Sequence, residues 1–380
     1  MAGNAFRAEI LIMLTLSDKI RQQIVSDGPI TIAKYMEEAM GHPRLGYYMG
    51  KDPFGRAGDF ITAPEISQMF GELIGLWCGY QWRGMGEEKQ FNLIEFGPGR
   101  GTLMADILRA GRGVDGFVES ISLSLVEISP VLKGVQEATL LSSTGGEVRR
   151  TRGLRWISQL AESPDGPFAA VANEFIDVLG IRQYQKTAEG WRERLVDVSE
   201  EGPLMFRFVL SEFPPEVGIV PKNLKDARID DVVEVSPSAI ALIQELASRL
   251  KRNPGFVLLI DYGHNFTACG ETLQAVKDHD YHNPLNNPGS ADLTAHVDFE
   301  ALCKVATEFG AAVYGPVTQG AFLTSLGIHT RARNLVDASP ANAREIDEVL
   351  ARLTSDDGMG ALFKVVALTS PGFPPPIGFQ

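Results

Sequence analysis

Apolar positions in residues 1–90 recur at the three- to four-residue spacing of amphipathic helices. The pattern predicts one helix over Leu16–Asp27, a second helix that Thr31 caps, and a third over residues 65–82. A loop rich in glycine, aspartate and proline, residues 51–64, precedes the third helix. We therefore expect residues 1–90 to form an N-terminal helical segment that carries one long loop.

From residue 91 onward, continuous apolar runs of strand length alternate with helical patterns. Such alternation requires right-handed crossovers and favours an α/β fold, with a mostly parallel sheet and helices on both faces. The expected strands are Phe91–Phe96, Ile121–Val126, Leu154–Ile157, 168–172, 255–260, 311–317 and 361–369, and the expected helices are 102–110, 130–141, Pro237–Arg252, 298–309 and 331–353, the last with a break near Pro340.

The alternation is interrupted twice. Residues 183–198 and 204–210 show strand patterns joined by turn residues, which predict an inserted antiparallel region. Residues 265–295 are polar and show neither period, so we expect a long loop there. The chain is thereby divided into the N-terminal segment 1–90, the first part of the sheet 91–180, the insert 181–235, the remainder of the sheet 236–370 and a frayed tail 371–380.

Composition and charge narrow the class of protein. Of the 380 residues, 44% are hydrophobic and 22% are charged, as in ordinary globular proteins. The net charge of −13 disfavours nucleic-acid binding, which needs clustered lysine and arginine. No apolar run approaches the roughly 18 residues that cross a bilayer, and the three cysteines lack the spacing of a disulfide framework or a zinc site. We therefore expect no membrane span and a cytoplasmic location, or the mitochondrial matrix if a longer precursor carries a presequence.

The segment from Glu95 to Thr102 joins the first predicted strand of the sheet to the next helix. Its glycines Gly97, Gly99 and Gly101 allow a tight turn and let a ligand approach the backbone. The amides that open the following helix point into the cleft where parallel sheets bind ligands. The spacing matches neither a dinucleotide loop nor a P-loop, and Glu95 suits a positively charged ligand better than a pyrophosphate. Taken alone, such a turn can also be a plain connection.

The same loop resembles motif I of the class I methyltransferases, which bind S-adenosylmethionine. The resemblance implies that the loop, Pro98 included, holds this cofactor, whose sulfonium and ammonium charges suit nearby carboxylates. A second acid of that class, after the next strand, binds the ribose hydroxyls, and Glu127 stands at this place. By itself Glu127 could be a solvated acid at a strand end. Asn173 is a further candidate contact, and the class implies a Rossmann-like sheet of seven strands.

Several longer runs are more specific than the glycine loop. They are residues 28–30, 35–36, 46–48, 58–67 (GDFITAPEIS), 70–73, 95–102, 173–175, 177–179, 261–264 and 291–299. Together they resemble the MidA-type proteins, a family of bacterial and mitochondrial methyltransferase-like proteins whose mitochondrial members are assembly factors of respiratory complex I. The departures are small: Ala63 stands where many members have serine, and Gly180 where proline is common.

The resemblance implies a type II protein arginine methyltransferase, which forms symmetric dimethylarginine on the 49 kDa-type subunit of complex I. Nothing in the composition or spacing indicates that substrate. Two other functions remain open: a non-catalytic assembly chaperone that binds the cofactor only structurally, and a methyltransferase of small molecules. The latter would require a compact apolar acceptor pocket.

Methylation of a guanidinium, which stays charged at ordinary pH, needs carboxylates that orient it and accept a proton. Glu174, directly at a strand end, is the first candidate for catalysis. Asp177 is the second, although an aspartate there could instead cap a helix. Asp261 and His264 follow another strand end and could line the same cleft. His264 could accept a proton near neutral pH, or serve only the structure.

The residues before the third helix of the N-terminal segment are expected to fold over the cofactor, with Phe60, Thr62 and Glu65 as contacts. In the alternative, Thr62 merely opens the helix and Glu65 interacts with its dipole. His279 and His282 have a spacing that some metal sites use, but no third ligand is evident, so we expect no metal site. The insert is expected to grip a protein substrate or to mediate a homodimer.

Overall fold

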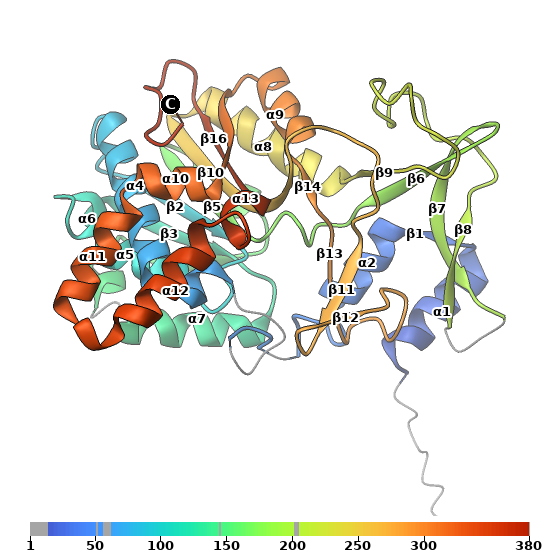
Figure 1. Ribbon diagram of the computed structural model, residues 1–380, viewed down its shortest axis with the longest axis horizontal. Helices are drawn as coiled ribbons and strands as arrows, with labels where there is room; N and C mark the ends of the chain where they lie inside the picture. The colour runs from blue at the N-terminus through green and yellow to red at the C-terminus, as the bar shows by residue number, and fades with distance from the viewer. Residues whose placement is uncertain (1–13, 51, 56–61, 144–145, 201–204, 380) are drawn as a thin grey trace, which may run out of the picture.

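The computed structural model describes residues 14–50, 52–55, 62–143, 146–200 and 205–379. Figure 1 shows two parts. The larger part, at the left, contains a central sheet with helices on both faces, and the smaller part, at the right, contains two helices and two antiparallel sheets. We call the smaller part the small lobe.

The strands of the central sheet are β2 (Phe91–Phe96), β3 (Ile121–Val126), β4 (Leu154–Ile157), β5 (Phe168–Asn173), β10 (Gly255–His264), β15 (Ala312–Thr318) and β16 (Phe363–Thr369). They lie in the order β15–β16–β10–β5–β2–β3–β4. β16 is antiparallel to both of its neighbours, and the remaining pairs are parallel. A two-residue strand, β14 (Val297–Asp298), adds to the end of β10. The expected seven-stranded, mostly parallel sheet of the class I fold is confirmed.

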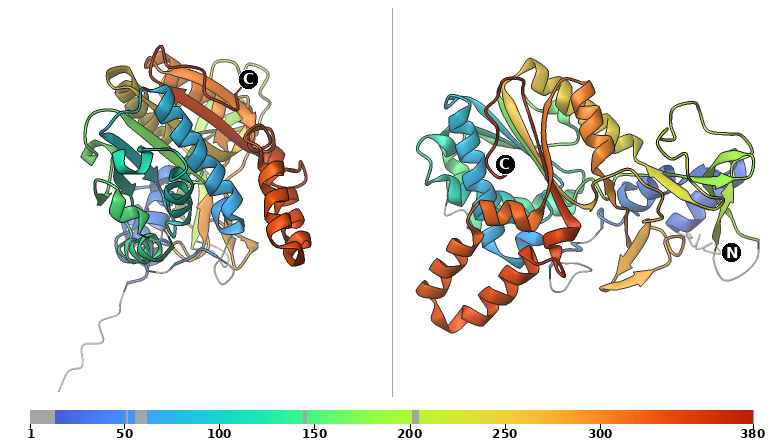
Figure 2. Two further views of the ribbon diagram at one scale, coloured as in Figure 1. Left: turned by 90° about the vertical axis from the view of Figure 1, so that its left-hand side faces the viewer. Right: turned by 45° about the horizontal axis from the view of Figure 1, so that its top comes forward.

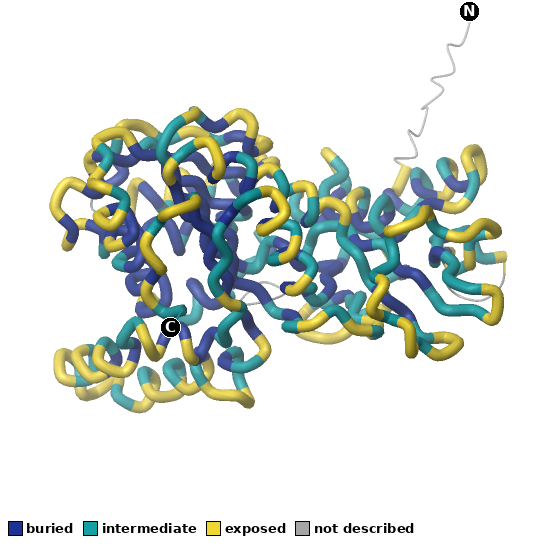
Figure 3. Tube along the Cα trace, turned by 90° about the horizontal axis from the view of Figure 1, so that it is seen from above, coloured by how far each residue is buried: buried dark blue, intermediate teal, exposed yellow. Residues whose placement is uncertain are grey.

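Burial on both faces explains why these strands are continuous apolar runs. In β10, Phe256 and Leu258 pack into one core and Val257 and Leu259 into the other, as alternation across a strand requires. Figure 2 shows helices on both sides of the sheet, and Figure 3 shows its strands as the most buried part of the chain. The first core lies beneath α4 (Gln68–Gly84), α5 (Thr102–Gly111), α6 (Phe117–Ser120) and α10 (Gln319–Ser325), and the second beneath α8 (Pro237–Arg252) and α9 (Phe299–Glu308).

An ion-pair cluster joins three helices on the first face. Glu72 of α4 contacts Nη1 of Arg109 in α5 at 2.5 Å and Nε of Arg331 in α11 (Ile328–Ala338) at 2.7 Å. Arg109 also binds Asp106 at 2.5 Å. Each carboxylate of this cluster therefore has a guanidinium partner.

The small lobe draws its elements from three stretches of the chain. It consists of α1 (Leu16–Asp27), β1 (Ile30–Thr31), α2 (Ile32–Gly41), β6 (Arg182–Thr187), β7 (Gly190–Val198), β8 (Phe206–Leu210), β9 (Val232–Val235), β11 (Gln274–Lys277), β12 (Asp280–His282) and β13 (Asp292–Thr294). One sheet has the order β1–β7–β6–β9 with β8 on β7, and the other the order β12–β11–β13. The antiparallel strands expected in the insert are confirmed.

Three expectations about the elements are wrong. The segment 265–295, expected as a loop, contains β11 to β13, whose buried side chains are too few to give a periodic pattern. The helix expected over 65–82 is two helices, α3 (Ala63–Ile66) and α4, because Ser67 is extended and caps α4 through the amide of Met69. The tail is docked: Trp77 donates its indole N–H to the carbonyl of Ile377 at 2.9 Å, and Phe379 packs on Phe322.

The remaining elements complete the large part. They are α7 (Pro130–Ser143), the 3₁₀ turns η1 (Glu147–Arg150), η2 (Leu160–Glu162) and η3 (Pro340–Asn342), α12 (Ala343–Thr354) and α13 (Met359–Leu362). The break expected near Pro340 is the η3 turn between α11 and α12. Among the described residues, no helix combines the length and the apolar character needed to cross a membrane.

Candidate active site

A cavity of about 830 Å³ lies between the carboxyl ends of the central strands and the small lobe. We call it the first cavity. Its wall combines residues that follow three neighbouring strands, β2, β3 and β5, with residues of α2, β11 and β13. The polar or backbone-exposing residues that line it include Gly97, Gly99, Glu127, Glu174, Asp177, Glu37, Tyr48, Asp292 and His296.

The glycine loop after β2 opens into this cavity. Gly97, Gly99 and Gly101 have φ values of 58°, 52° and 81°, in the left-handed region that favours glycine. A Cβ on Gly97 would lie 2.6 Å from the ring of Phe175, so a side chain there does not fit. Gly97 and Gly99 line the cavity, whereas Pro98 and Gly101 support the turn, in which the amide of Gly101 donates to the carbonyl of Pro98 at 2.7 Å. The loop therefore exposes bare backbone to a ligand.

Glu127 directly follows β3 and lines the same cavity. Its carboxylate accepts hydrogen bonds from the amide of Ser129 at 2.7 Å and from the side-chain amide of Gln136 at 3.0 Å. Gln136 also donates to the carbonyl of Gly99 at 2.8 Å, so it fixes Glu127 relative to the glycine loop. Burial raises the pKa of Glu127. No sequence pattern indicates a role for Gln136, which lies in the middle of α7.

Glu95 lies beneath the glycine loop and does not reach the cavity wall. It belongs to β2 itself, is 2% exposed, and its Oε2 atom has no hydrogen-bond partner among the described residues. Burial raises its pKa to about 8. An ionised Glu95 therefore needs a positive charge nearby, as a cationic ligand on the loop above would supply.

Glu174 occupies a special backbone position at the end of β5. Its φ of 51° is unusual for a residue with a side chain, and it turns the carboxylate into the first cavity. The Oε1 atom accepts from the amide of Ala63 at 3.0 Å and from the side chain of Asn173 at 3.2 Å. Burial raises the pKa of Glu174 to about 7, with a contribution from nearby Asp177. Asn173 does not line the cavity, and its buried Oδ1 atom is unpartnered in the part of the chain that the structure describes.

Asp177 lies beside Glu174 in the wall of the first cavity. Its Oδ2 atom accepts a hydrogen bond from the hydroxyl of Tyr262, while its buried Oδ1 atom has no partner within the described ranges. Burial raises the pKa of Asp177 to about 6. No helix begins at Asp177, so the interpretation of this residue as a helix cap is wrong.

Asp261 binds the backbone of the turn after β5, which contains Glu174 and Asp177. It is fully buried in β10, and its Oδ2 atom accepts from the amides of Phe175, Ile176 and Asp177 at 3.2, 2.9 and 3.2 Å. Burial and the nearby carboxylates raise its pKa. Asp261 does not line the first cavity and instead holds the backbone that presents Glu174 and Asp177.

His264 does not join Glu174 and Asp177. It lines a neighbouring cavity, and its Nδ1 atom lies 2.8 Å from the carbonyl oxygen of Phe266. The histidine in the wall of the first cavity is His296, whose pKa is lowered by burial and whose ring contacts that of Tyr262 edge-on.

The segment expected to cover the cofactor is attached to the glycine loop. Glu65 accepts a hydrogen bond from the hydroxyl of Thr102 and lies 3.6 Å from Nη1 of Arg100, so Glu65 and Thr102 bind each other and do not line the cavity. Thr62 precedes α3 without a side-chain capping bond. Phe60 lies outside the described residues.

Sequence reasoning missed several polar residues of the cavity wall, among them Tyr48, Asp292 and His296. The Tyr48 hydroxyl donates to Asp292 at 2.8 Å, which joins the segment after α2 to β13. All three lie in runs that resemble the MidA-type family, residues 46–48 and 291–299. The signal was therefore present, but no spacing linked these runs to the glycine loop.

The charge of the first cavity is strongly negative. Its lining includes five acidic residues and, among the described residues, one lysine, Lys34, which is paired with Glu37 at 3.1 Å and Glu38 at 3.0 Å. Such a wall favours a cation, and the exposed glycine backbone beside Glu127 fits the adenosyl group of a cationic cofactor. Over the described ranges, no group of three His, Cys, Asp or Glu residues could hold a metal ion.

Comparisons with known proteins agree with this geometry. The family model of S-adenosyl-L-methionine-dependent methyltransferases (Methyltransf_28) matches residues 73–317. Two relatives are named "Protein arginine methyltransferase NDUFAF7, mitochondrial": the protein from Homo sapiens is 39% identical over 91% of this chain and 81% of its own length, and the protein from Danio rerio is 38% identical over 91% and 84%. Their names agree with the mitochondrial location considered above and do not support the cytoplasmic one.

A solved structure extends the comparison to three dimensions. The crystal structure of a COG1565 superfamily member from Burkholderia thailandensis, bound to S-adenosyl-homocysteine, has a TM-score of 0.82 and 28% identity, and the match covers 96% of this chain and 93% of that chain. The resemblance to the MidA-type family and the expected cofactor are thereby confirmed. This chain belongs to the family of S-adenosyl-L-methionine-dependent methyltransferases that contains these relatives.

Proposed function

We propose that this protein is an arginine N-methyltransferase that acts on protein substrates, with the target guanidinium bound in the first cavity. The observation that carries the proposal is the pair Glu174 and Asp177. Both carboxylates line the cavity, burial raises the pKa of each, and neither forms an ion pair with a lysine or arginine among the described residues. The charge of Arg352 lowers the pKa of Glu174 but does not offset the effect of burial. A guanidinium would supply the missing positive charge and can bind two carboxylates through its planar set of donors.

The methyl donor binds, in this proposal, on the backbone of Gly97 and Gly99, with its ribose hydroxyls on Glu127 and its positive charge near Glu95. The bound cofactor supplies an electrophilic methyl group. What remains for the chain is to align the acceptor nitrogen with that methyl, which is chiefly a matter of orientation. Glu174 and Asp177 orient the guanidinium, hold its charge away from the attacking nitrogen, and accept the proton that methylation releases.

The proposal also specifies the methyl acceptor and the protein that carries it. The name of the human relative supports arginine in a protein as the methyl acceptor. From the family resemblance we propose symmetric dimethylation of an arginine on the 49 kDa-type subunit of complex I. The wide, acidic first cavity suits a residue on a polypeptide better than a compact apolar molecule.

Calorimetry with S-adenosylmethionine tests the cofactor half of the proposal. We expect Gly97→Val to abolish binding, because its Cβ would meet Phe175, and Glu127→Ala to weaken it about tenfold through lost charge-assisted hydrogen bonds. Asp356→Ala, on the exposed turn after α12, is the matched control and should bind as the wild type does. Unchanged affinity in both site variants would refute the assigned site.

Mass spectrometry of the 49 kDa-type subunit, with and without this enzyme, tests the substrate half. We expect a symmetric dimethylarginine that disappears when Glu174→Gln replaces the wild type. Normal complex I assembly in a Glu174→Gln strain, with cofactor affinity retained, would instead favour a non-catalytic chaperone. Methyl transfer from the purified enzyme to a small molecule but to no protein would favour the third function.

A further inference from the structure

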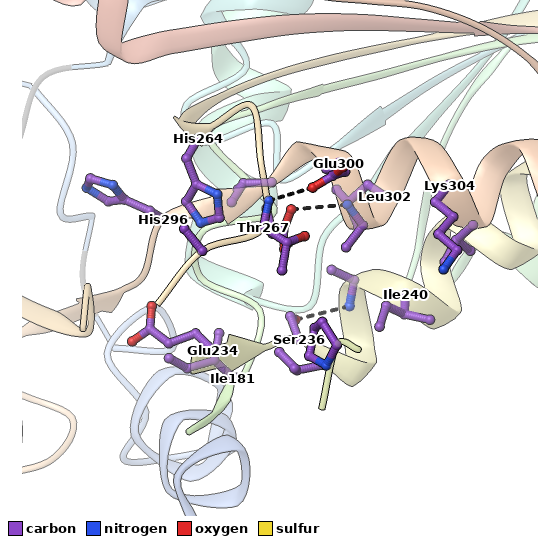
Figure 4. Close-up of a pocket in the computed structure, with 18 of the residues that line it drawn as sticks. Ile181, Glu234, Ser236, Ile240, His264, Thr267, His296, Glu300, Leu302 and Lys304 are labelled. Atoms are coloured by element: carbon purple, nitrogen blue, oxygen red, sulfur yellow. Dashed lines mark hydrogen bonds between the residues drawn. The ribbon is translucent and has the colours of Figure 1, made fainter. Parts of the chain in front are cut away.

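A second cavity, also of about 830 Å³, adjoins the first. Figure 4 shows it beside the first turns of α8 and α9, with His264 and His296 on one side and Ile240 and Lys304 on the other. No residue to which the proposed reaction assigns a role lines it, so it needs a separate explanation.

The two cavities share a wall. In the turn after β5, Phe175 and Asp177 line the first cavity, whereas Ile176 and Ile181 line the second. His296 lines both cavities. The turn after β5 and the His296 ring therefore form a wall that the two cavities share, next to Asp177.

The chemistry of the second cavity differs from that of the first. Three of its four carboxylates accept backbone hydrogen bonds: Glu234 from the amides of Thr272 and Leu273 at 3.0 and 3.2 Å, Glu300 from the amide of Thr267 at 2.7 Å, and Asp298 from the amide of Ala301 at 3.0 Å. The fourth, Glu308, is exposed. The lining also contains the exposed lysines Lys222 and Lys304, and aliphatic side chains that include Ile176, Ile181, Ile219, Ile240, Leu302 and Val305. Satisfied acids and aliphatic walls favour an apolar occupant over a cation.

The rim of this cavity also exposes large apolar side chains. Val217, which directly precedes the lining loop 218–223, is fully exposed, and Phe266, beside the lining residue Thr267, is 74% exposed. Exposed large apolar side chains next to a hollow are typical of surfaces that bind other proteins.

We propose that the second cavity receives an apolar side chain of the polypeptide that presents its arginine to the first cavity. The inference rests on the proposed function and deepens it: the enzyme recognises an arginine that has an apolar residue a short distance away along the substrate chain. The occupant is part of the substrate because the two cavities meet at His296 and the turn after β5.

The test uses short fluorescent peptides, each with one arginine among polar residues and a single phenylalanine placed at successive positions. Binding is measured by anisotropy with S-adenosyl-homocysteine present, and methyl transfer is measured separately with labelled S-adenosylmethionine. We expect phenylalanine at one or two positions to strengthen binding about tenfold, the usual discrimination of an apolar pocket.

Two variants and a matched control locate the effect. Ala301→Trp fills the second cavity and should remove the preference for phenylalanine, whereas Ala241→Trp, on the exposed side of α8, should retain it. Val217→Asp alters only the exposed rim, so its folding is not in question, and it should weaken the preference. In every protein, calorimetry with S-adenosylmethionine should give the wild-type affinity.

The proposal is overturned if phenylalanine has no preferred position, or if Ala301→Trp and Val217→Asp both retain the preference. It is also overturned if the wild type is a dimer that Val217→Asp dissociates, because a second copy of the chain then covers this surface. Failure of the proposed function looks different: the phenylalanine preference persists in binding, but no peptide is methylated.

Discussion

Two clusters of acidic side chains in this protein have similar composition and opposite surroundings. Glu72 and Asp106 lie on α4 and α5, and each contacts a guanidinium, from Arg109 or Arg331, at 2.5 to 2.7 Å. Glu174 and Asp177 lie after β5 and form no ion pair in the described part of the chain, and burial raises the pKa of both. Burial also raises the pKa of Asp106, to about 6, so the ion pairs and not the pKa values distinguish the two clusters. In the first cluster two arginines balance the charge of the two carboxylates, whereas the second cluster contains no ion pair among the described residues.

The presence or absence of ion pairs favours Glu174 and Asp177, and not Glu72 and Asp106, as the carboxylates that bind a ligand. A buried carboxylate without a cation costs folding free energy, which is tolerated where the missing charge arrives with a ligand. A carboxylate paired within the chain contributes to the packing of helices and leaves nothing for a ligand to bind. Glu72 and Glu174 are therefore matched positions at which the same substitution compares the two clusters.

The largest contrast is in catalysis. Glu174→Gln removes a charge from the proposed guanidinium site at constant volume, and we expect kcat for methyl transfer to fall about a hundredfold or more. Glu72→Gln should keep kcat near that of the wild type. Radiolabelled methyl transfer at saturating cofactor measures both. If the two variants lose activity equally, the comparison between the clusters fails.

The second contrast is in the dependence of activity on pH. The carboxylates must be ionised to hold a guanidinium, and the pKa values of Glu174 and Asp177 are about 7 and about 6. We therefore expect kcat/KM to rise with pH through this range and to level off above it, with a decrease of about tenfold per pH unit on the acid side for each group that must ionise. A flat profile from pH 5 to 8, the range about these pKa values, would contradict a role for either group.

The third contrast is in stability. Glu72→Gln leaves the guanidinium groups of Arg109 and Arg331, whose side chains are 34% and 33% exposed, without their shared partner. We expect the free energy of unfolding to fall by about 1–2 kcal/mol, less than for a fully buried pair. Denaturant unfolding of the cofactor-free protein at neutral pH measures the change. Arg344→Gln, which disrupts a highly exposed pair with Glu348, is the control and should change stability little.

The smallest expected effect is a gain in stability, where the preceding substitution gives a loss. The pKa of Glu174 is raised from 4.5 to about 7, so the folded state binds its proton more tightly than the unfolded state does. This group therefore costs stability as pH rises through that interval, and the cost is absent below pH 4.5. We expect Glu174→Gln to be about 1 kcal/mol more stable than the wild type at pH 8 and equal to it in mild acid. A destabilised variant at pH 8 would show that Glu174 has a structural role.

The sequence predicted the central sheet well because its strands are buried on both faces. Phe91–Phe96 and Ile121–Val126 are uninterrupted apolar runs bounded by turn residues, and their limits agree with β2 and β3. β11 to β13 were missed because they are three or four residues long and pack mainly through Ala275 and Leu293. Short strands of this kind are defined by their partners, which a local pattern does not contain.

Those parts of the candidate site that directly follow a strand of the central sheet were predictable from the sequence. The glycine loop, Glu127 and Glu174 line the first cavity as a sheet with crossovers implies. The functions of Tyr262 and Asp261 were not predictable, because each depends on a contact with the turn after β5, more than eighty positions earlier in the chain. Glu65 and Thr102 were identified as polar contacts, but their mutual hydrogen bond depends on the fold.

The docked C-terminal tail has a practical consequence for anyone who shortens or extends this protein. Phe373 packs on Phe256, and Phe379 packs on Phe322, while the backbone of Ile377 satisfies the indole of Trp77. Truncation after β16 would leave these aromatic rings facing water and one indole N–H without its acceptor. Residues 371–379 therefore cover the first core, and we expect their removal to cause aggregation even though the first cavity stays intact.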